Sequence, residues 1–337
     1  MSTCLPMTSW YDDLCSCLQV DVACVLRFHG WDPVRALGAS WRFTFVPGTC
    51  EPVEFYHPCR DEDLADALAA GQPLHAEWRW PSDAADAAAQ LRAAIDAGRP
   101  PIVAVDNYHL PFRPAYRDVH AAHLVVVRGY DGDTVQVLDP MPPAFDGSLA
   151  DSALATSRAA ATVTDRTDPF FAGSSLRGRW LEVYPTGRQP DWSWAWVERI
   201  LRDNLSALAG PARDDSGRLT GLAGFAAYVE DLPDRARVEG EKLRQELYVL
   251  GWWTQAAAAL HGQFLSAAGQ VLHRPDLVAA GRLADRVAHE WTGLRIAAAH
   301  GGDSALLPGR LRSRGRRVLR AWEQAVGDIG DALGAAA

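Results

Sequence analysis

Residues 120–139, HAAHLVVVRGYDGDTVQVLD, decide the fold of the N-terminal half of this 337-residue chain. Two apolar runs rich in β-branched residues, Leu124–Tyr130 and Thr134–Leu138, flank an Asp-Gly-Asp turn, which is typical of a β-hairpin. An antiparallel hairpin would bring His123, at the start of its first strand, close to Asp139, at the end of its second.

Helices and further strands are expected on both sides of this hairpin. Apolar residues recur at helical spacing from Leu18 up to His29-Gly30, where a glycine suits the helix end. Two more helices are predicted at Leu64–Ala70 and Ala84–Ala97, and strands at Trp41–Val46, Ile102–Val105 and Trp180–Tyr184. Helices mixed with an antiparallel sheet indicate an α+β domain over residues 1–185.

The pattern changes after residue 185. Helical periodicity then dominates, no strand is expected, and glycine or proline separates most of the helices at Gly210-Pro211, Pro233 and His300-Gly301-Gly302. The predicted helices are Trp192–Leu208, Leu219–Glu230, Arg237–Leu265, Pro275–Ala299 and Leu307–Leu333. We therefore predict a second, all-α helical-bundle domain over residues 186–337.

Composition excludes several classes of protein. The net charge is −9, divided as −10 over residues 1–185 and +1 over residues 186–337, which argues against a nucleic-acid partner. The longest apolar runs, such as Ala121–Val127, are too short to span a membrane, and the N-terminus lacks the features of a signal peptide. We expect a cytoplasmic protein with no membrane partner.

The cysteines point to thiol chemistry rather than to a metal. All six lie in the first 59 residues, at spacings that match no common structural zinc pattern, so no metal site is expected. In a reducing compartment they are expected to be thiols. They are Cys4, Cys15, Cys17, Cys24, Cys50 and Cys59.

Cys17 is the candidate nucleophile. It stands just before an apolar helix, where free backbone N–H groups and the helix dipole favour a thiolate. The alternative is a buried cysteine with a structural role. Cys15 is the rival nucleophile but would precede the helix, and Cys24, two turns further on, is better explained by core packing.

His123 and Asp139 complete a candidate catalytic triad. A thiolate nucleophile needs a base within hydrogen-bond reach, and the base needs an acceptor that orients it. His123 could be that base and Asp139 the orienting group. Two alternatives remain open: Asp139 could simply begin the Asp-Pro turn, and His120 could be the base instead.

These residues resemble a known family. A cysteine thirteen residues before a glycine, then a strand-opening histidine sixteen residues before Asp-Pro, is similar to the papain-like domain of bacteriocin-processing peptidases. A closer resemblance, over residues 11–185, is to the butirosin-biosynthesis acyltransferase (BtrH) family. It is carried by Asp106-x-Tyr108-x-Leu110-Pro111, then Tyr116, His120-x-x-His123 and Gly129-Tyr130-Asp131. The resemblance implies a papain-like cysteine protease fold, followed by the helical domain.

The resemblance also implies an activity. Members of this family transfer an acyl group from the phosphopantetheine of an acyl or peptidyl carrier protein to a small-molecule amine, without a cofactor of their own. Cys17 would carry the acyl group, while Asp106, Tyr108 and His120 would be substrate candidates. Tyr11 stands where the peptidases place an oxyanion-hole glutamine, so its hydroxyl could serve instead and proteolysis is in doubt. A thioesterase or release cyclase, a cysteine peptidase, and a non-catalytic carrier-binding module remain alternatives.

A cluster of arginines near the C-terminus is the candidate docking surface for the carrier protein. Carrier proteins are acidic, and a basic helical patch would steer them. A solvated helix face is the alternative. The cluster comprises Arg310, Arg312, Arg314, Arg316, Arg317 and Arg320.

Overall fold

The computed structural model describes residues 2–46, 63–159, 176–300 and 305–334. The chain forms two compact units. The first contains Met1–Pro33, Asp61–Ala65 and Pro73–Arg188, and the second contains Val34–Arg60, Asp66–Gln72 and Gln189–Ala337. Cys50 and Cys59 lie outside the described residues.

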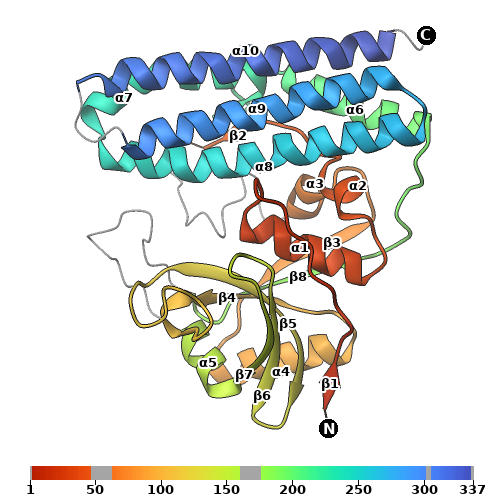
Figure 1. The fold of residues 1–337 in the computed structure, drawn as a ribbon, viewed down its shortest axis with the longest axis vertical. Helices are drawn as coiled ribbons and strands as arrows, with labels where there is room; N and C mark the ends of the chain where they lie inside the picture. The colour runs from red at the N-terminus through yellow and green to blue at the C-terminus, as the bar shows by residue number, and fades with distance from the viewer. Residues whose placement is uncertain (1, 47–62, 160–175, 301–304, 335–337) are drawn as a thin grey trace. The chain divides into compact units, whose positions relative to one another are not determined.

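The first unit is built on an antiparallel sheet of seven strands in the order β3-β8-β4-β5-β6-β7, with β1 paired to β5 (Figure 1). A mixed helix-and-sheet fold is therefore confirmed. The strands are β1 (Thr3–Cys4), β3 (Leu74–Arg79), β4 (Ile102–Asp106), β5 (Ala122–Asp131), β6 (Thr134–Asp139), β7 (Phe145–Ala150) and β8 (Trp180–Pro185).

The predicted hairpin is confirmed as β5 and β6. Asp131 pairs with Thr134 across the turn, and Gly132 has the positive φ of 56° that such turns favour in glycine. Strands β3 and β7 were not predicted from the sequence. β3 is half exposed, and β7 contains Gly147, so both give weak strand signals.

Helices cover this sheet. They are α1 (Cys17–Phe28), α4 (Ala84–Asp96) and α5 (Asp151–Ala159), together with the short 3-10 helix η2 (Asn107–His109). Helix α1 packs against β5 and β8. An apolar core joins α4 and α5 to the strands, with Leu91, Ile95 and Leu154 packing on valines of β4, β5 and β6.

The second unit is mainly helical. It contains α2 (Pro33–Leu37), α6 (Trp194–Leu208), α7 (Gly221–Val238), α8 (Glu241–Val271), α9 (Pro275–His300) and α10 (Leu307–Gly334), and α3 (Leu64–Leu68) lies where the chain passes between the units. Helix α9 packs against both α8 and α10, and α10 against α7.

Two details of the helical half correct the sequence reading. Pro233 does not separate helices but lies inside α7, which continues to Val238, and both Leu232 and Pro233 are buried. A short strand, β9 (Leu219–Thr220), precedes α7 and pairs with β2 (Thr44–Phe45), so this half is not free of strands.

The pairing of β2 with β9 explains why Val34–Arg60 groups with the helices. Trp41 stacks on Trp322 with ring centroids 5.4 Å apart. The ring centroids of Phe43 and Phe225 are 5.2 Å apart. Burial of these large aromatic side chains stabilises the packing of this segment against the helices. The sequence, by contrast, assigned this segment to the first domain.

A buried histidine lies in the same aromatic core. His261 is fully buried, its Nδ1 donates to the carbonyl of Gly38 at 2.8 Å, and its ring stacks 4.9 Å from Trp41. Burial lowers the pKa of His261 to about 4, because the charged ring would lose its hydration. Within the described structure, no group donates a hydrogen bond to Nε2.

We predict that His261 makes the protein sensitive to acid. Between pH 6.5 and about 4 the unfolded chain binds a proton that the folded chain does not, so stability falls as the pH drops through this window. At pH 5 the loss is ~2 kcal/mol. His261→Asn keeps the donor but cannot titrate, so its urea-unfolding free energy should depend less on pH.

The exposed His300 provides the control, because His300→Asn should follow the wild-type profile. Equal pH dependence of His261→Asn and wild type would contradict the assignment.

No helix within the described parts of the chain is both long and apolar enough to cross a bilayer.

Candidate functional site

Cys17 is the first residue of α1, as its spacing from the apolar residues predicts. Ser16 caps the helix, and the side chain of Gln19 accepts a hydrogen bond from the Ser16 backbone N–H at 3.1 Å. This reciprocal cap fixes where the helix begins and leaves the first N–H groups without partners inside the helix. Cys17 is therefore held at the positive end of the helix dipole, 5% exposed.

His123 and Asp139 are hydrogen-bonded. The distance from His123 Nε2 to Asp139 Oδ2 is 2.9 Å, and both side chains are buried. In the β5–β6 register Val126 faces Leu138, so Asp139 lies diagonally opposite His123, within reach of its ring. Because a carboxylate can only accept, Nε2 carries the proton and Nδ1 keeps its lone pair.

Arg113 is a member of this site that the sequence did not reveal. Its Nη1 lies 3.1 Å from Asp139 Oδ2 and donates to the carbonyl of Met141 at 3.1 Å. Asp139 Oδ1 in turn accepts from the Met141 backbone N–H at 3.0 Å. These contacts balance the charge of a carboxylate that is completely buried and fix its orientation. Arg113 lies in a proline-rich loop, where no periodic pattern marks it.

Asp21, one turn beyond Cys17, is a second buried acid. Both of its carboxylate oxygens are buried without a hydrogen-bond partner among the described residues. Burial raises the pKa of Asp21 well above its usual value, and the charge of Asp139 raises it further, while Arg113 opposes the shift. Because Asp21 feels the charge of Asp139, the Cys17 helix extends close to the His123–Asp139 pair.

The other cysteines of this region have protonated thiols. Cys15 is buried, and burial and then the charge of Asp12 raise its pKa well above the usual value. Burial raises the pKa of Cys24 to about 12, and its sulfur accepts from the Trp10 N–H at 3.1 Å. Neither environment favours a nucleophilic thiolate.

Asp106, Tyr108 and His120 come together at the end of β4. His120 Nδ1 lies 2.6 Å from Asp106 Oδ2, and the ring of Tyr108 stacks on His120. Asp106 pairs with Ala122 in the β4–β5 ladder, next to the rung formed by Val105 and His123. This cluster and His123 therefore share one end of the sheet.

Tyr11 and the cavity of this unit are less well placed to take part in catalysis. Tyr11 is 41% exposed, and its side chain is hydrogen-bonded to Asp13. A cavity of about 640 Å³ between α4 and α5 is lined by Val127 and Val135 but by none of the predicted catalytic residues. It lies toward the turn of the hairpin, away from His123.

Asp21 should make stability fall as the pH rises. The unfolded chain releases the Asp21 proton near pH 3.8, whereas the folded chain keeps it to a higher pH. We therefore expect Asp21→Asn to gain stability over wild type above pH 4, by up to about 1.4 kcal/mol per pH unit. Guanidinium unfolding at a series of pH values measures this.

Asp118→Asn, at an exposed position, is the control and should track the wild type. A constant difference between Asp21→Asn and wild type across this pH range would refute the account of Asp21.

A comparison with known protein families gives a match that covers the three predicted catalytic residues. Residues 16–140 match the family described as butirosin biosynthesis protein H, N-terminal, and include Cys17, His123 and Asp139. A sequence search of curated proteins finds no match. Helix α1, strands β3 to β6 and the buried His123–Asp139 pair lie in the matched region, whereas β1, β7 and β8 lie outside it. Residues 16–140 are therefore similar to the N-terminal part of butirosin biosynthesis protein H.

Proposed function

We propose that this protein is a cysteine-dependent acyltransferase with a papain-like catalytic domain. It would transfer an acyl or aminoacyl group from a carrier-protein thioester to a small-molecule amine in natural-product biosynthesis. The observation that carries the proposal is the buried His123–Asp139 hydrogen bond, beside a helix that begins with Cys17. The match to the family described as butirosin biosynthesis protein H, N-terminal, supports a role in natural-product biosynthesis.

The first half of the reaction loads the enzyme. His123 Nδ1 takes the Cys17 thiol proton, and the thiolate attacks the thioester carbonyl. The tetrahedral intermediate collapses, the proton passes from His123 to the departing phosphopantetheine thiol, and the acyl group remains on Cys17. The backbone N–H of Cys17 stabilises the oxyanion, and the Tyr11 hydroxyl is a second candidate donor after rotation away from Asp13.

The second half transfers the acyl group. The acceptor amine attacks the Cys17 thioester, His123 takes the amine proton, and collapse of the intermediate releases an amide. The Cys17 thiolate then recovers its proton from His123. Asp139 stabilises the imidazolium in both halves, and Arg113 keeps Asp139 from turning away.

We predict that Cys17→Ala lowers turnover more than about a thousandfold, whereas Cys15→Ala retains most of it. The reason is that Cys15 is buried with a raised pKa, while Cys17 occupies the helix start. Incubation with an acyl-loaded carrier should add one acyl mass to the wild type and to Cys15→Ala, but not to Cys17→Ala. The reverse pattern would assign the nucleophile to Cys15.

The same trapping experiment separates the alternatives. Discharge of the adduct by water alone would indicate a thioesterase, and discharge by an internal amine a cyclase. Peptide cleavage without carrier would indicate a peptidase. No adduct on any variant, together with carrier binding, would favour a non-catalytic binding module.

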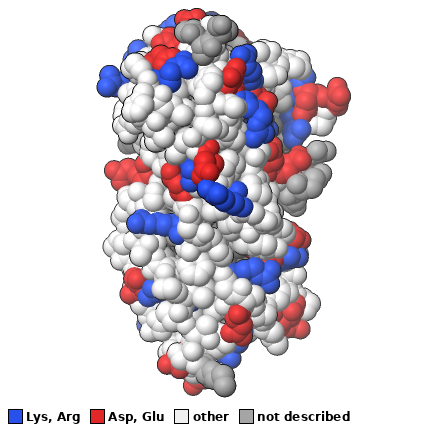
Figure 2. Space-filling view, turned by 90° about the vertical axis from the view of Figure 1, so that its right-hand side faces the viewer, with Lys and Arg blue, Asp and Glu red and all other residues white. Residues whose placement is uncertain are grey.

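Carrier docking is the second part of the proposal. Three arginines of α10 are already paired: Arg312 and Arg316 with Glu230, and Arg317 with Glu290. In the described structure, no ion pair involves Arg310, Arg314 or Arg320. Acidic and basic side chains intermingle on the face drawn in Figure 2, so unpaired cations matter more than the total charge. The unpaired arginines are therefore the stronger docking candidates.

We expect Arg310→Glu/Arg320→Glu to raise the Michaelis constant for the carrier at least about tenfold at low ionic strength. The effect should shrink as salt is added, because salt screens exposed charges. Arg316→Gln, which removes a paired cation, is the control and should change the constant less. Equal constants for the double variant and the wild type would remove this docking surface.

A further inference from the structure

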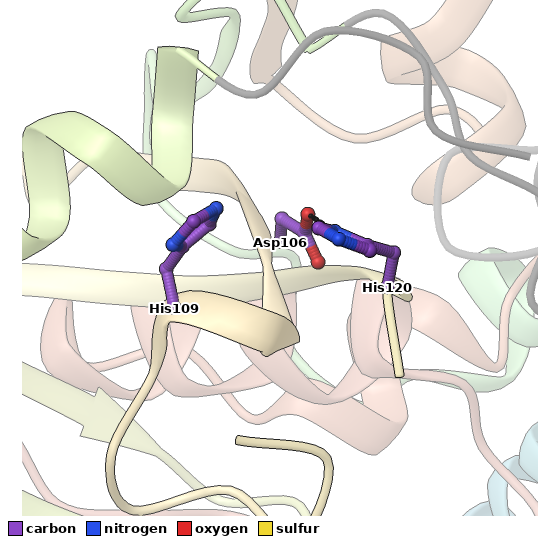
Figure 3. A group of neighbouring side chains, drawn as sticks. All are labelled: Asp106, His109 and His120. Atoms are coloured by element: carbon purple, nitrogen blue, oxygen red, sulfur yellow. Dashed lines mark hydrogen bonds and ion pairs between the residues drawn. The ribbon is translucent and has the colours of Figure 1, made fainter. Parts of the chain in front are cut away.

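Asp106, His109 and His120 direct three potential metal ligands toward a common region (Figure 3). One ligand atom from each lies within 4.8 Å of the others. Asp106 ends β4, His109 ends the 3-10 helix η2, and His120 precedes β5. The cluster thus joins two chain segments that the β4–β5 ladder holds together.

The carboxylate of Asp106 is fixed in advance. Its Oδ1 accepts from the backbone N–H groups of Tyr108 at 3.0 Å and Ala121 at 3.1 Å. Its Oδ2 faces His120 Nδ1 at 2.6 Å. Hydrogen bonds to the non-ligating oxygen are the usual support of a metal-binding carboxylate.

The imidazoles are also well placed. The Tyr108 ring lies parallel to His120 at a centroid distance of 4.0 Å, which restricts rotation of that histidine. The side chain of His120 is 26% exposed and that of Asp106 only 8%, so the cluster is open to solvent on one side. A small ion could enter without unfolding the loop.

The charge around the cluster favours a cation. Among the described residues, the one ion-pair partner of Asp106 is His120. A second group of potential ligands, His75, Glu77 and Glu182, is different. There Arg79 pairs with both glutamates and Arg99 pairs with Glu182, so their negative charge is already neutralised. Of these two clusters in the described residues, the Asp106 cluster is the one whose carboxylate has no arginine partner.

We propose that Asp106, His109 and His120 bind a divalent first-row transition-metal ion of the zinc class. Two imidazoles and a carboxylate are a preferred donor set for such ions, with bonds of about 2.0–2.2 Å. Binding of the ion displaces the proton shared by Asp106 Oδ2 and His120 Nδ1. These two atoms move apart from 2.6 Å, because two ligand atoms on one such ion lie roughly 3.3–3.6 Å apart, and the His109 ring adjusts to complete the set. The exposed side leaves a coordination position for water or a solute oxygen. Cys17 is not one of its ligands.

Cobalt(II) titration of the full chain tests the site. The wild type should bind one equivalent and show visible d–d bands without a sulfur-to-cobalt charge-transfer band, because no thiolate is a ligand. His109→Ala should bind at least about 100-fold more weakly, since even indirect partners contribute 10–100-fold. His75→Ala, from the arginine-neutralised cluster, is the matched control and should bind as the wild type does.

The titration is repeated with Cys17→Ala, which should behave as wild type, so failure of the acyl-transfer proposal would leave this result unaffected. His109→Gln provides a second variant if His109→Ala does not fold. The proposal is overturned if no one-equivalent binding occurs, if a thiolate band accompanies it, or if cobalt binds folded His109 variants as tightly as the wild type. Asp106 and His120 would then be a hydrogen-bonded pair only.

Discussion

The hydrogen bond between His123 and Asp139 is the interaction on which the candidate site depends. It joins the start of one strand to the end of the next, so its geometry is set by the register of the whole β5–β6 hairpin. A shift of one residue would send one of the two side chains to the opposite face of the sheet. The turn at Asp131–Asp133 sets this register and thereby positions His123 and Asp139 at the other end of the hairpin.

Burial strengthens the His123–Asp139 hydrogen bond, but it also requires that the charge of Asp139 be compensated. In a low-dielectric environment an unpaired carboxylate is costly, and Asp139 is completely buried. Arg113 supplies the compensating charge, and the backbone of Met141 holds the second oxygen. Asp21 has no hydrogen-bond partner among the described residues, and burial together with the charge of Asp139 raises its pKa. An anion, a cation and a second acid with a raised pKa thus lie close together.

The β4–β5 ladder serves two purposes. Along the ladder, from Val127 to Val105, valines pack against α4 and α5 and stabilise the sheet. At the end away from the hairpin turn, the ladder holds His123 and, one rung away, Asp106 with His120. Rigid strands thereby position polar groups that a loop alone would leave mobile. The acyl-transfer proposal and the metal proposal both rest on this end.

The sequence by itself determined the local elements and the nearest pairing. The position of α1, the β5–β6 hairpin and the long helices follow from periodicity and turn residues, which act over a few residues. The closeness of His123 and Asp139 could be inferred because only a short turn separates their strands.

Only the tertiary structure decided the contacts between distant segments. Arg113 reaches Asp139 from an irregular loop, and His109 joins Asp106 through a 3-10 turn that no pattern announces. Trp41 was predicted to lie in the first domain, yet it packs among helices of the second unit because its burial there outweighs its local strand propensity. Pairing between residues far apart in sequence depends on the complete packing of the chain, so it leaves no periodic signal.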